Sequence, residues 1–200
     1  MNITKIIENK KNKVVEYINQ GEIIFTDYGI SGIPIMQLST YASKALKEKN
    51  RVKVVLDFFP DMEYSLLVKN LKSRRAYNDK KSDRDILVGM INIKLGEYIL
   101  CKSLGVNISN GDRVKIKELA SVLKGMELEV TDTNSWDNAQ VTAGGVSTKE
   151  IDSKTMESKL SKGLYITGEL MDIDGTCGGY NLQWAWTSGY VAGRSAAMDS

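Results

Sequence analysis

Short apolar runs alternate with turn-forming residues over the first sixty positions. β-Branched and apolar residues gather at 3–7, 14–18 and 22–26 between turn-rich segments, and this pattern predicts a strand at each range. Residues 51–59 alternate valine, leucine and phenylalanine with charged side chains and end at Pro60. That alternation predicts a strand with one face toward water.

Apolar residues at helical spacing predict helices in the middle of the chain. One helix is predicted from about Ile35 to Lys49, and others over 62–77, 83–104 and 114–123. Residues 128–131 then have the pattern of a returning strand. The order of strands, helices and a further strand favours an α+β fold, in which a helical excursion interrupts a sheet subdomain.

The last third of the chain is rich in glycine, threonine and aromatic residues. Residues 164–169 predict a buried parallel strand ending in Gly168 and Glu169, and 182–197 predict a final helix. A carboxylate after such a strand can accept hydrogen bonds from ligand hydroxyls. Gly178 and Gly179 expose backbone N–H groups before that helix, where an electron-rich ligand atom could be received. Tight turns and packing would explain the same spacing equally well.

Composition excludes several kinds of chemistry. The 200 residues contain no histidine, which excludes Ser-His-Asp and Cys-His catalysis, histidine-ligated zinc and a histidine pH switch. Cys101 and Cys177 match neither a disulfide framework nor a metal motif, so we predict no metal site and a reducing, cytoplasmic compartment. Polar residues and glycines interrupt the longest uncharged stretch, 175–193, and no targeting segment is visible, so we expect no membrane association.

Charge gives little indication of a nucleic-acid partner. Lysine and arginine total 27 against 25 acidic residues, a net charge of +2. One local basic stretch could displace phosphate counterions, but no recognition motif accompanies it, and we interpret it as a solvated helix face. Its members are Lys69, Lys72, Arg74, Arg75, Lys80, Lys81 and Arg84.

Five segments of the chain resemble one bacterial flavoprotein family. They are Gly21–Gly32, Gln140–Val146, Thr155–Ser158, Gly163–Glu169 and Asp172–Ala185. In this order they are similar to the NAD(P)/FAD-dependent oxidoreductases that include aminoacetone oxidase and the BaiN-type proteins. The motifs are long and are distributed over most of the chain, from residue 21 to residue 185, so the resemblance is specific.

The resemblance implies a Rossmann-type FAD-binding domain interrupted by an insertion. It assigns 1–60 and 126–137 to a β-barrel-like part of the insertion, 61–125 to a helical part, and 138–200 to the C-terminal segment of the FAD-binding domain. By similarity, Glu169 would bind the ribityl region of FAD, and the start of the last helix would face the isoalloxazine. The cofactor-binding residues implied are Thr142, Gly144, Gly145, Gly168, Glu169, Gly178, Gly179, Tyr180, Asn181 and Leu182.

One element of the family pattern is missing. The chain contains no G-x-G-x-x-G, the turn that places the FAD pyrophosphate at a helix N-terminus. We therefore expect a fragment of an FAD-dependent oxidoreductase that does not retain FAD by itself, because losing the pyrophosphate site should cost several kcal/mol, with about tenfold in affinity for each 1.4 kcal/mol. No residue identifies the catalytic groups, the small-molecule substrate, or the electron donor and acceptor, and the family's description suggests NAD(P)H as one partner.

The alternative is a non-catalytic binding module that docks a substrate or partner without FAD. A tail that evolved to pack inside a larger sheet would then expose Leu164, Ile166, Trp184 and Trp186. Exposed apolar patches of that kind mark an interface or a risk of aggregation. Under this reading we expect either a homo-oligomer or a complementing N-terminal half.

Overall fold

The chain forms two compact units, Met1–Asp132 and Thr133–Ser200. The structure, a computed structural model, describes residues 2–10, 13–77, 83–105, 113–134 and 136–198. Each unit has its own cluster of buried apolar side chains, so each is described by itself.

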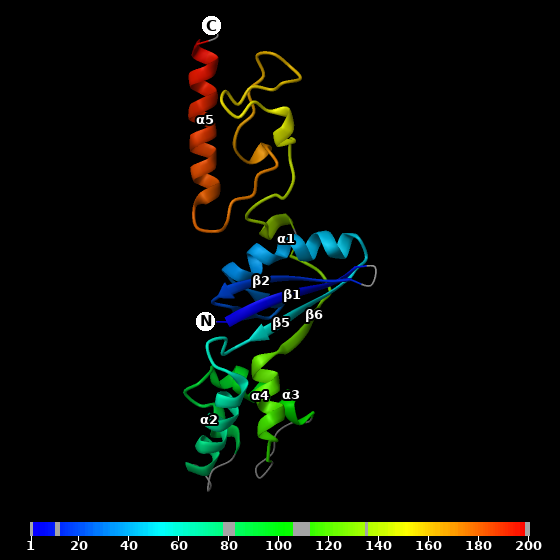
Figure 1. Cartoon of the computed structure of the whole chain (residues 1–200), viewed down its shortest axis with the longest axis vertical. Coiled ribbons are helices and arrows are strands. Elements are labelled where there is room, and N and C mark those ends of the chain that lie inside the picture. The colour runs from blue at the N-terminus through cyan, green and yellow to red at the C-terminus, as the bar shows by residue number, and fades with distance from the viewer. Residues whose placement is uncertain (1, 11–12, 78–82, 106–112, 135, 199–200) are drawn as a thin grey trace. The chain divides into compact units, whose positions relative to one another are not determined.

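A four-stranded antiparallel sheet organises the first unit (Figure 1). Its strands are β1 (Asn2–Lys10), β2 (Lys13–Gly21), β5 (Arg51–Asp57) and β6 (Met126–Val130), in the order β2-β1-β5-β6. The strands β1 and β2 run further than the sequence pattern indicated, since residues 8–10 pair within the sheet instead of forming a turn. Among the described residues the sheet is open, with β2 and β6 at its edges, so the predicted barrel-like subdomain is not confirmed.

A separate hairpin joins β3 (Ile24–Thr26) and β4 (Gly29–Ser31). The sequence predicted a strand at 22–26 but missed β4, because the short run before Pro34 has the composition of a loop. Asp27 and Tyr28 form the connection, and the Thr26 hydroxyl donates to the Gly29 carbonyl at 3.2 Å across it.

Helix α1 (Ile33–Lys47) covers one face of the sheet (Figure 1). Its buried side chains Leu38, Ala42 and Ala45 belong to the same core as Val52 and Leu56 of β5. On β5 the intervening side chains Arg51 and Lys53 are exposed. This confirms the prediction that the strand has one face toward water.

The segment between β5 and β6 is helical and contains α2 (Tyr64–Tyr77), α3 (Ile93–Leu104) and α4 (Ile116–Lys124). The prediction of one helix over 83–104 is wrong. A short 3-10 helix, η1 (Asp83–Leu87), ends before Gly89, whose φ of 78° is unfavourable for other residues. The chain restarts as α3 where the Asn92 side chain accepts a hydrogen bond from the Lys94 N–H at 3.0 Å.

The helical segment is attached firmly to the end of β5. Leu67, Ile99 and Leu119 are fully buried in the core that also contains the β5 side chains. The Phe58 N–H donates to the Leu123 carbonyl at 3.0 Å, and the Lys124 ammonium lies 2.7 Å from the Asp57 carboxylate. The helices and the sheet of the first unit therefore share one hydrophobic core.

The second unit consists of a long helix, α5 (Tyr180–Met198), and a segment of short turns packed along it. The turns include the 3-10 helices η2 (Trp136–Asn138), η3 (Thr148–Glu150) and η4 (Gly168–Leu170). The prediction of a strand over 164–169 is wrong: Tyr165 makes one isolated bridge with Glu157, and Leu164 is exposed. Gly168, with a φ of 63°, turns the backbone out of the extended conformation.

The described helices were also compared with the requirements of a membrane span. None of them has the length and apolar character needed to cross a bilayer.

Candidate functional site

The N-terminus of α5 presents a group of backbone donors. Gly178 and Gly179 precede it with φ values of 119° and 92°, and the first hydrogen bond of the helix runs from the Gln183 N–H to the Gly179 carbonyl at 3.0 Å. Within the described part of the chain, the N–H groups of Tyr180, Asn181 and Leu182 donate to no acceptor. Such first-turn N–H groups attract anionic or electron-rich atoms.

The Asn181 side chain fixes the loop that leads into the helix. Its Oδ1 accepts a hydrogen bond from the Gly175 N–H at 2.7 Å, and its Nδ2 donates to the Gly175 carbonyl at 3.4 Å. A Cβ at position 175 would lie 2.8 Å from that Oδ1, so the contact requires glycine. The side chain is thus used to hold the loop and does not cap the free N–H groups of α5.

Gly168 is held against α5 through both of its backbone groups. Its N–H donates to the Ser188 hydroxyl at 3.0 Å, and its carbonyl accepts from the Trp184 indole at 3.1 Å. The Ser188 hydroxyl in turn donates to the Trp184 carbonyl at 2.7 Å. Because Ser188 and Gly168 are buried, this small network sets the position of the next residue, Glu169.

The Glu169 carboxylate is aimed at the segment 142–146. Its Oε1 accepts a hydrogen bond from the Thr142 N–H at 2.7 Å, and Val146 exchanges backbone hydrogen bonds with Leu170 and Asp172 at 2.8 and 2.9 Å. Gly145 is packed so closely there that a Cβ would lie 2.6 Å from the Leu170 carbonyl oxygen. At Gly144, with a φ of 100°, nothing lies within 4 Å of a Cβ position.

The ten residues predicted to bind a cofactor all lie in the second unit and form two groups. In the first group Glu169 is bonded to Thr142, with Gly144 and Gly145 following in the same segment and Gly168 next to Glu169 in the chain, whereas residues 178–182 surround the start of α5. Both groups are attached to the same helix, the first through Gly168 and the second through the chain itself. The sequence missed Ser188 and Gly175 as positioning residues, although the i, i+4 spacing of Trp184 and Ser188 could have indicated one helix face.

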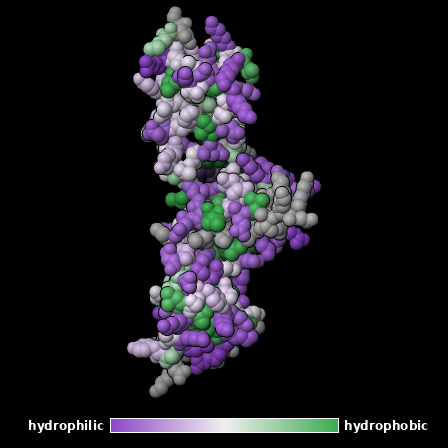
Figure 2. Space-filling model, in the orientation of Figure 1, coloured by the Kyte–Doolittle hydropathy of each residue, from purple (hydrophilic) through white to green (hydrophobic). Residues whose placement is uncertain are grey.

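Several large apolar side chains of the second unit are exposed. Trp186 is 67% exposed and Leu164 47%, as expected for a tail with an uncovered face, whereas Ile166 and Trp184 are partly buried. Tyr180 and Leu182, at the start of α5, are 63% and 60% exposed. The face of the molecule drawn in Figure 2 is mostly hydrophilic, with small separate hydrophobic areas.

The family of the chain follows from comparison with known proteins. The HI0933-like protein Rossmann domain matches residues 2–195, and the chain belongs to this family. This confirms the resemblance to the oxidoreductase family found in the sequence. The family domain is of the Rossmann type, although the described residues of the second unit contain isolated bridges and no regular strand.

Curated relatives extend the comparison to named activities. The chain is 43% identical, over 88% of its length, to a 3-dehydro-bile acid delta(4,6)-reductase of Clostridium scindens. It is 34% identical over 87% of its length to a ribosomal RNA dihydrouridine synthase of Haemophilus influenzae, and 30% identical over 86% to that of Escherichia coli. It spans 44%, 42% and 41% of these proteins, respectively, which is less than half of each.

Proposed function

We propose that the chain is part of an FAD-dependent oxidoreductase and contributes the segments that contact the ribityl chain and the isoalloxazine. The names of the relatives support an oxidoreductase, since a reductase is a redox enzyme and dihydrouridine differs from uridine by two hydrogen atoms. A bile acid and a ribosomal RNA are very different substrates. We therefore take the reaction class, and not the substrate, from these names.

One observation supports the proposal most directly: backbone N–H groups without an acceptor and the Glu169 carboxylate are both held in place by helix α5. The first-turn N–H groups of α5 are free within the described chain, and no side chain fills the space above Gly144 and Gly179. A flat ring can lie directly against the backbone only where the residues are glycines and no other side chain occupies the space next to them. The residues present therefore fit a flavin.

The individual roles follow from the donors and acceptors at each position. Glu169 uses Oε1 for the Thr142 N–H, which leaves Oε2 to accept hydrogen bonds from hydroxyl groups of a ribityl chain. The N–H groups at the start of α5 would donate to the electron-rich oxygen edge of the ring system. Ser188 and Trp184 are positioning residues that hold Gly168 and hence Glu169. The bound flavin would supply the electron transfer, and the protein the position and electrostatics.

FAD retention tests the proposal. The purified chain is incubated with FAD and desalted, alone and after mixing with the part of the Clostridium scindens reductase that it does not match. We expect a colourless chain alone and a yellow, co-eluting complex from the mixture. A mixture that retains no flavin and in which the two parts do not co-elute would overturn the proposal.

Matched variants make the test specific to the site. Glu169→Gln removes the ribityl acceptor charge and should weaken FAD binding in the mixture by about tenfold, as expected for one charge-assisted hydrogen bond. Glu150→Gln changes the same residue type at an exposed position of the same unit and should leave it unchanged. Equal effects of the two variants would contradict the role assigned to Glu169.

A further inference from the structure

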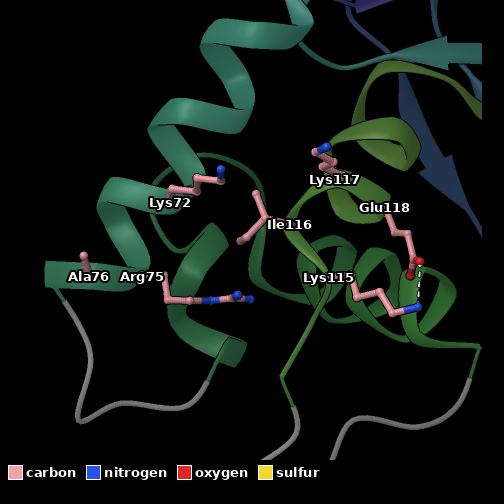
Figure 3. Close-up of a pocket in the computed structure, with 7 residues that line it drawn as sticks. All are labelled: Lys72, Arg75, Ala76, Lys115, Ile116, Lys117 and Glu118. Atoms are coloured by element: carbon pink, nitrogen blue, oxygen red, sulfur yellow. Dashed lines mark hydrogen bonds and ion pairs between the residues drawn. The ribbon is translucent and has the colours of Figure 1, made fainter.

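A basic groove lies in the first unit, between the C-terminal half of α2 and the start of α4 (Figure 3). Its volume is about 590 Å³. Lys72, Arg75 and Ala76 line it from α2. Lys115, Ile116, Lys117 and Glu118 line it from α4 and the residue before it.

The groove carries four cations and one carboxylate, and the carboxylate is already engaged. The Glu118 Oε1 lies 3.0 Å from the Lys115 ammonium. Within the described chain, the ammonium groups of Lys72 and Lys117 form no ion pair. Two cations therefore remain available for an external anion, in addition to Arg75.

Arg75 is held rigidly by a buried carboxylate. Its Nη2 and Nε donate to the two oxygens of Asp83 at 2.8 and 3.2 Å, and its Nη2 also donates to the Val114 carbonyl. The Asp83 side chain is only 2% exposed. Among the described residues, Nη1 of Arg75 has no hydrogen-bond partner. The side chains of Lys72 and Arg75 both extend from α2 toward Ile116 (Figure 3). A fixed guanidinium loses little entropy when an anion binds.

Asp83 also fixes the other side of the groove. Its Oδ2 accepts a hydrogen bond from the Val114 N–H at 2.8 Å, two residues before α4. The first hydrogen bond of α4 runs from the Leu119 N–H to the Lys115 carbonyl, so the N–H groups of Ile116, Lys117 and Glu118 have no acceptor among the described residues. These donors belong to the first turn of α4, which lines the groove together with the lysine and arginine residues.

We propose that this groove binds a phosphate group of a phosphate-bearing ligand. A phosphate offers more oxygens and more charge than a carboxylate, which matches cations from two helices together with backbone donors. The groove is larger than one phosphate, and Ile116 and Ala76 provide an apolar wall beside the cations. The basic stretch interpreted from the sequence as a solvated face thus includes two members, Lys72 and Arg75, of a built site. The inference does not rest on flavin binding, since all its residues lie in the first unit.

Inorganic phosphate is the first probe, with the 200-residue chain and no FAD. Backbone N–H resonances are followed by NMR during a phosphate titration against chloride at equal ionic strength. We expect saturable shifts of the Ile116, Lys117 and Glu118 N–H groups and of the Arg75 Nε–H. The absence of saturable shifts at these positions would overturn the proposal.

A pair of double variants separates this site from general charge. Lys72→Ala/Lys117→Ala should raise the dissociation constant for phosphate by about tenfold or more. Lys47→Ala/Lys162→Ala removes the same charge from exposed positions elsewhere and should change it by less than about twofold. Equal weakening by both pairs would overturn the proposal. Far-ultraviolet circular dichroism checks that all variants fold.

A short single-stranded RNA and a nucleoside monophosphate distinguish the source of the phosphate. Tighter binding of the RNA than of the monophosphate, with a salt dependence that Lys72→Ala/Lys117→Ala reduces, assigns the site to a phosphodiester of a longer strand. Equal affinity of the two assigns it to a terminal phosphate. If neither ligand responds to Lys72→Ala/Lys117→Ala, the proposed site is wrong.

Discussion

Trp184 donates its indole N–H to the carbonyl of Gly168 at 3.1 Å, across sixteen positions of the chain. This bond joins the second turn of α5 to the 3-10 helix that contains Glu169. Ser188, one turn further along α5, accepts the N–H of the same glycine at 3.0 Å. One helix face therefore satisfies both backbone groups of Gly168, and the second unit depends on this junction.

Removing the Ser188 hydroxyl should destabilise the second unit. In Ser188→Ala the buried Gly168 N–H loses its acceptor, which we expect to cost about 1–3 kcal/mol of unfolding free energy. All three tryptophans lie in the second unit, so urea unfolding followed by tryptophan fluorescence reports on it. Ser195→Ala, on the same helix, is the control and should have little effect. A stability equal to that of the control would show that water satisfies the Gly168 N–H instead.

The adjacent glycines Gly144 and Gly145 should respond differently to alanine. Both have positive φ, so either substitution introduces backbone strain of about 1–3 kcal/mol. At Gly145 the new Cβ would also lie 2.6 Å from the Leu170 carbonyl oxygen, whereas at Gly144 it meets open space. Gly145→Ala should therefore destabilise the second unit more than Gly144→Ala does. Tryptophan fluorescence during urea unfolding measures both, and equal losses would contradict the close packing described.

Asp83→Asn should destabilise the first unit strongly. The variant leaves the Arg75 guanidinium and the Val114 N–H without their buried charged acceptor, and breaking such a pair costs about 3–5 kcal/mol. Asp61→Asn, an exposed change of the same type, should be nearly neutral. Far-ultraviolet circular dichroism during urea unfolding follows the helices of both units, and tryptophan fluorescence, which reports on the second unit alone, separates the contribution of the first. A loss no larger than that of Asp61→Asn would show that Asp83 does not organise the start of α4.

The cross-strand pair Lys53–Glu127 should give a pH-dependent contribution to stability. The ammonium and carboxylate are 2.8 Å apart; this hydrogen bond, and then the opposite charge, lower the pKa of Glu127 from 4.5 and raise that of Lys53 from 10.5. Stability linked to Glu127 is present above pH 4.5 and is lost as the pH falls through the lowered pKa. Stability linked to Lys53 is present below pH 10.5 and is lost as the pH rises through the raised pKa.

Glu127→Gln tests the pH range over which the Lys53–Glu127 pair contributes to stability. The variant should be less stable than the parent between these two limits and should match it in strong acid, as measured by unfolding free energy over a pH series. Glu129→Gln, on the same strand, should have a smaller effect because Glu129 acts on Lys53 only through its charge. Both side chains of the pair are largely exposed, so added salt should weaken the contribution. A difference that persists unchanged in acid would contradict the ion-pair origin.

The spacing of apolar residues predicted those helices and strands whose buried face packs on the core of their own unit. The alternation at 51–59 and the helical spacing that gave α1 and α5 reflect faces that pack on a core of their own unit. The helix predicted over 83–104 failed because the apolar spacing continues through Gly89, while the backbone there turns. The strand predicted over 164–169 failed because an extended segment needs a pairing partner, and Tyr165 finds one bridge only.

The segments of the candidate site could be proposed from the sequence, but the hydrogen bonds that join them could not. Glycine pairs before a helix are visible in any sequence, so Gly178 and Gly179 could be found. The bond from the Thr142 N–H to Glu169 joins residues 27 positions apart, and no local pattern encodes it. The same holds for Arg75 and Val114, which meet at Asp83 across two helices.

The sheet topology has a consequence for how such a chain can be remodelled in evolution. Leu56 pairs with Met126, so the helical segment leaves and re-enters between two neighbouring antiparallel strands. Its two ends are already as close as those of a hairpin loop, which a turn of a few residues could connect. Duplication, exchange or deletion of this helical segment would leave the register of the strands unchanged. The pairing of β1 with β5 would be unchanged as well. Homologues can therefore acquire a different helical segment, with a different groove, while keeping the same sheet.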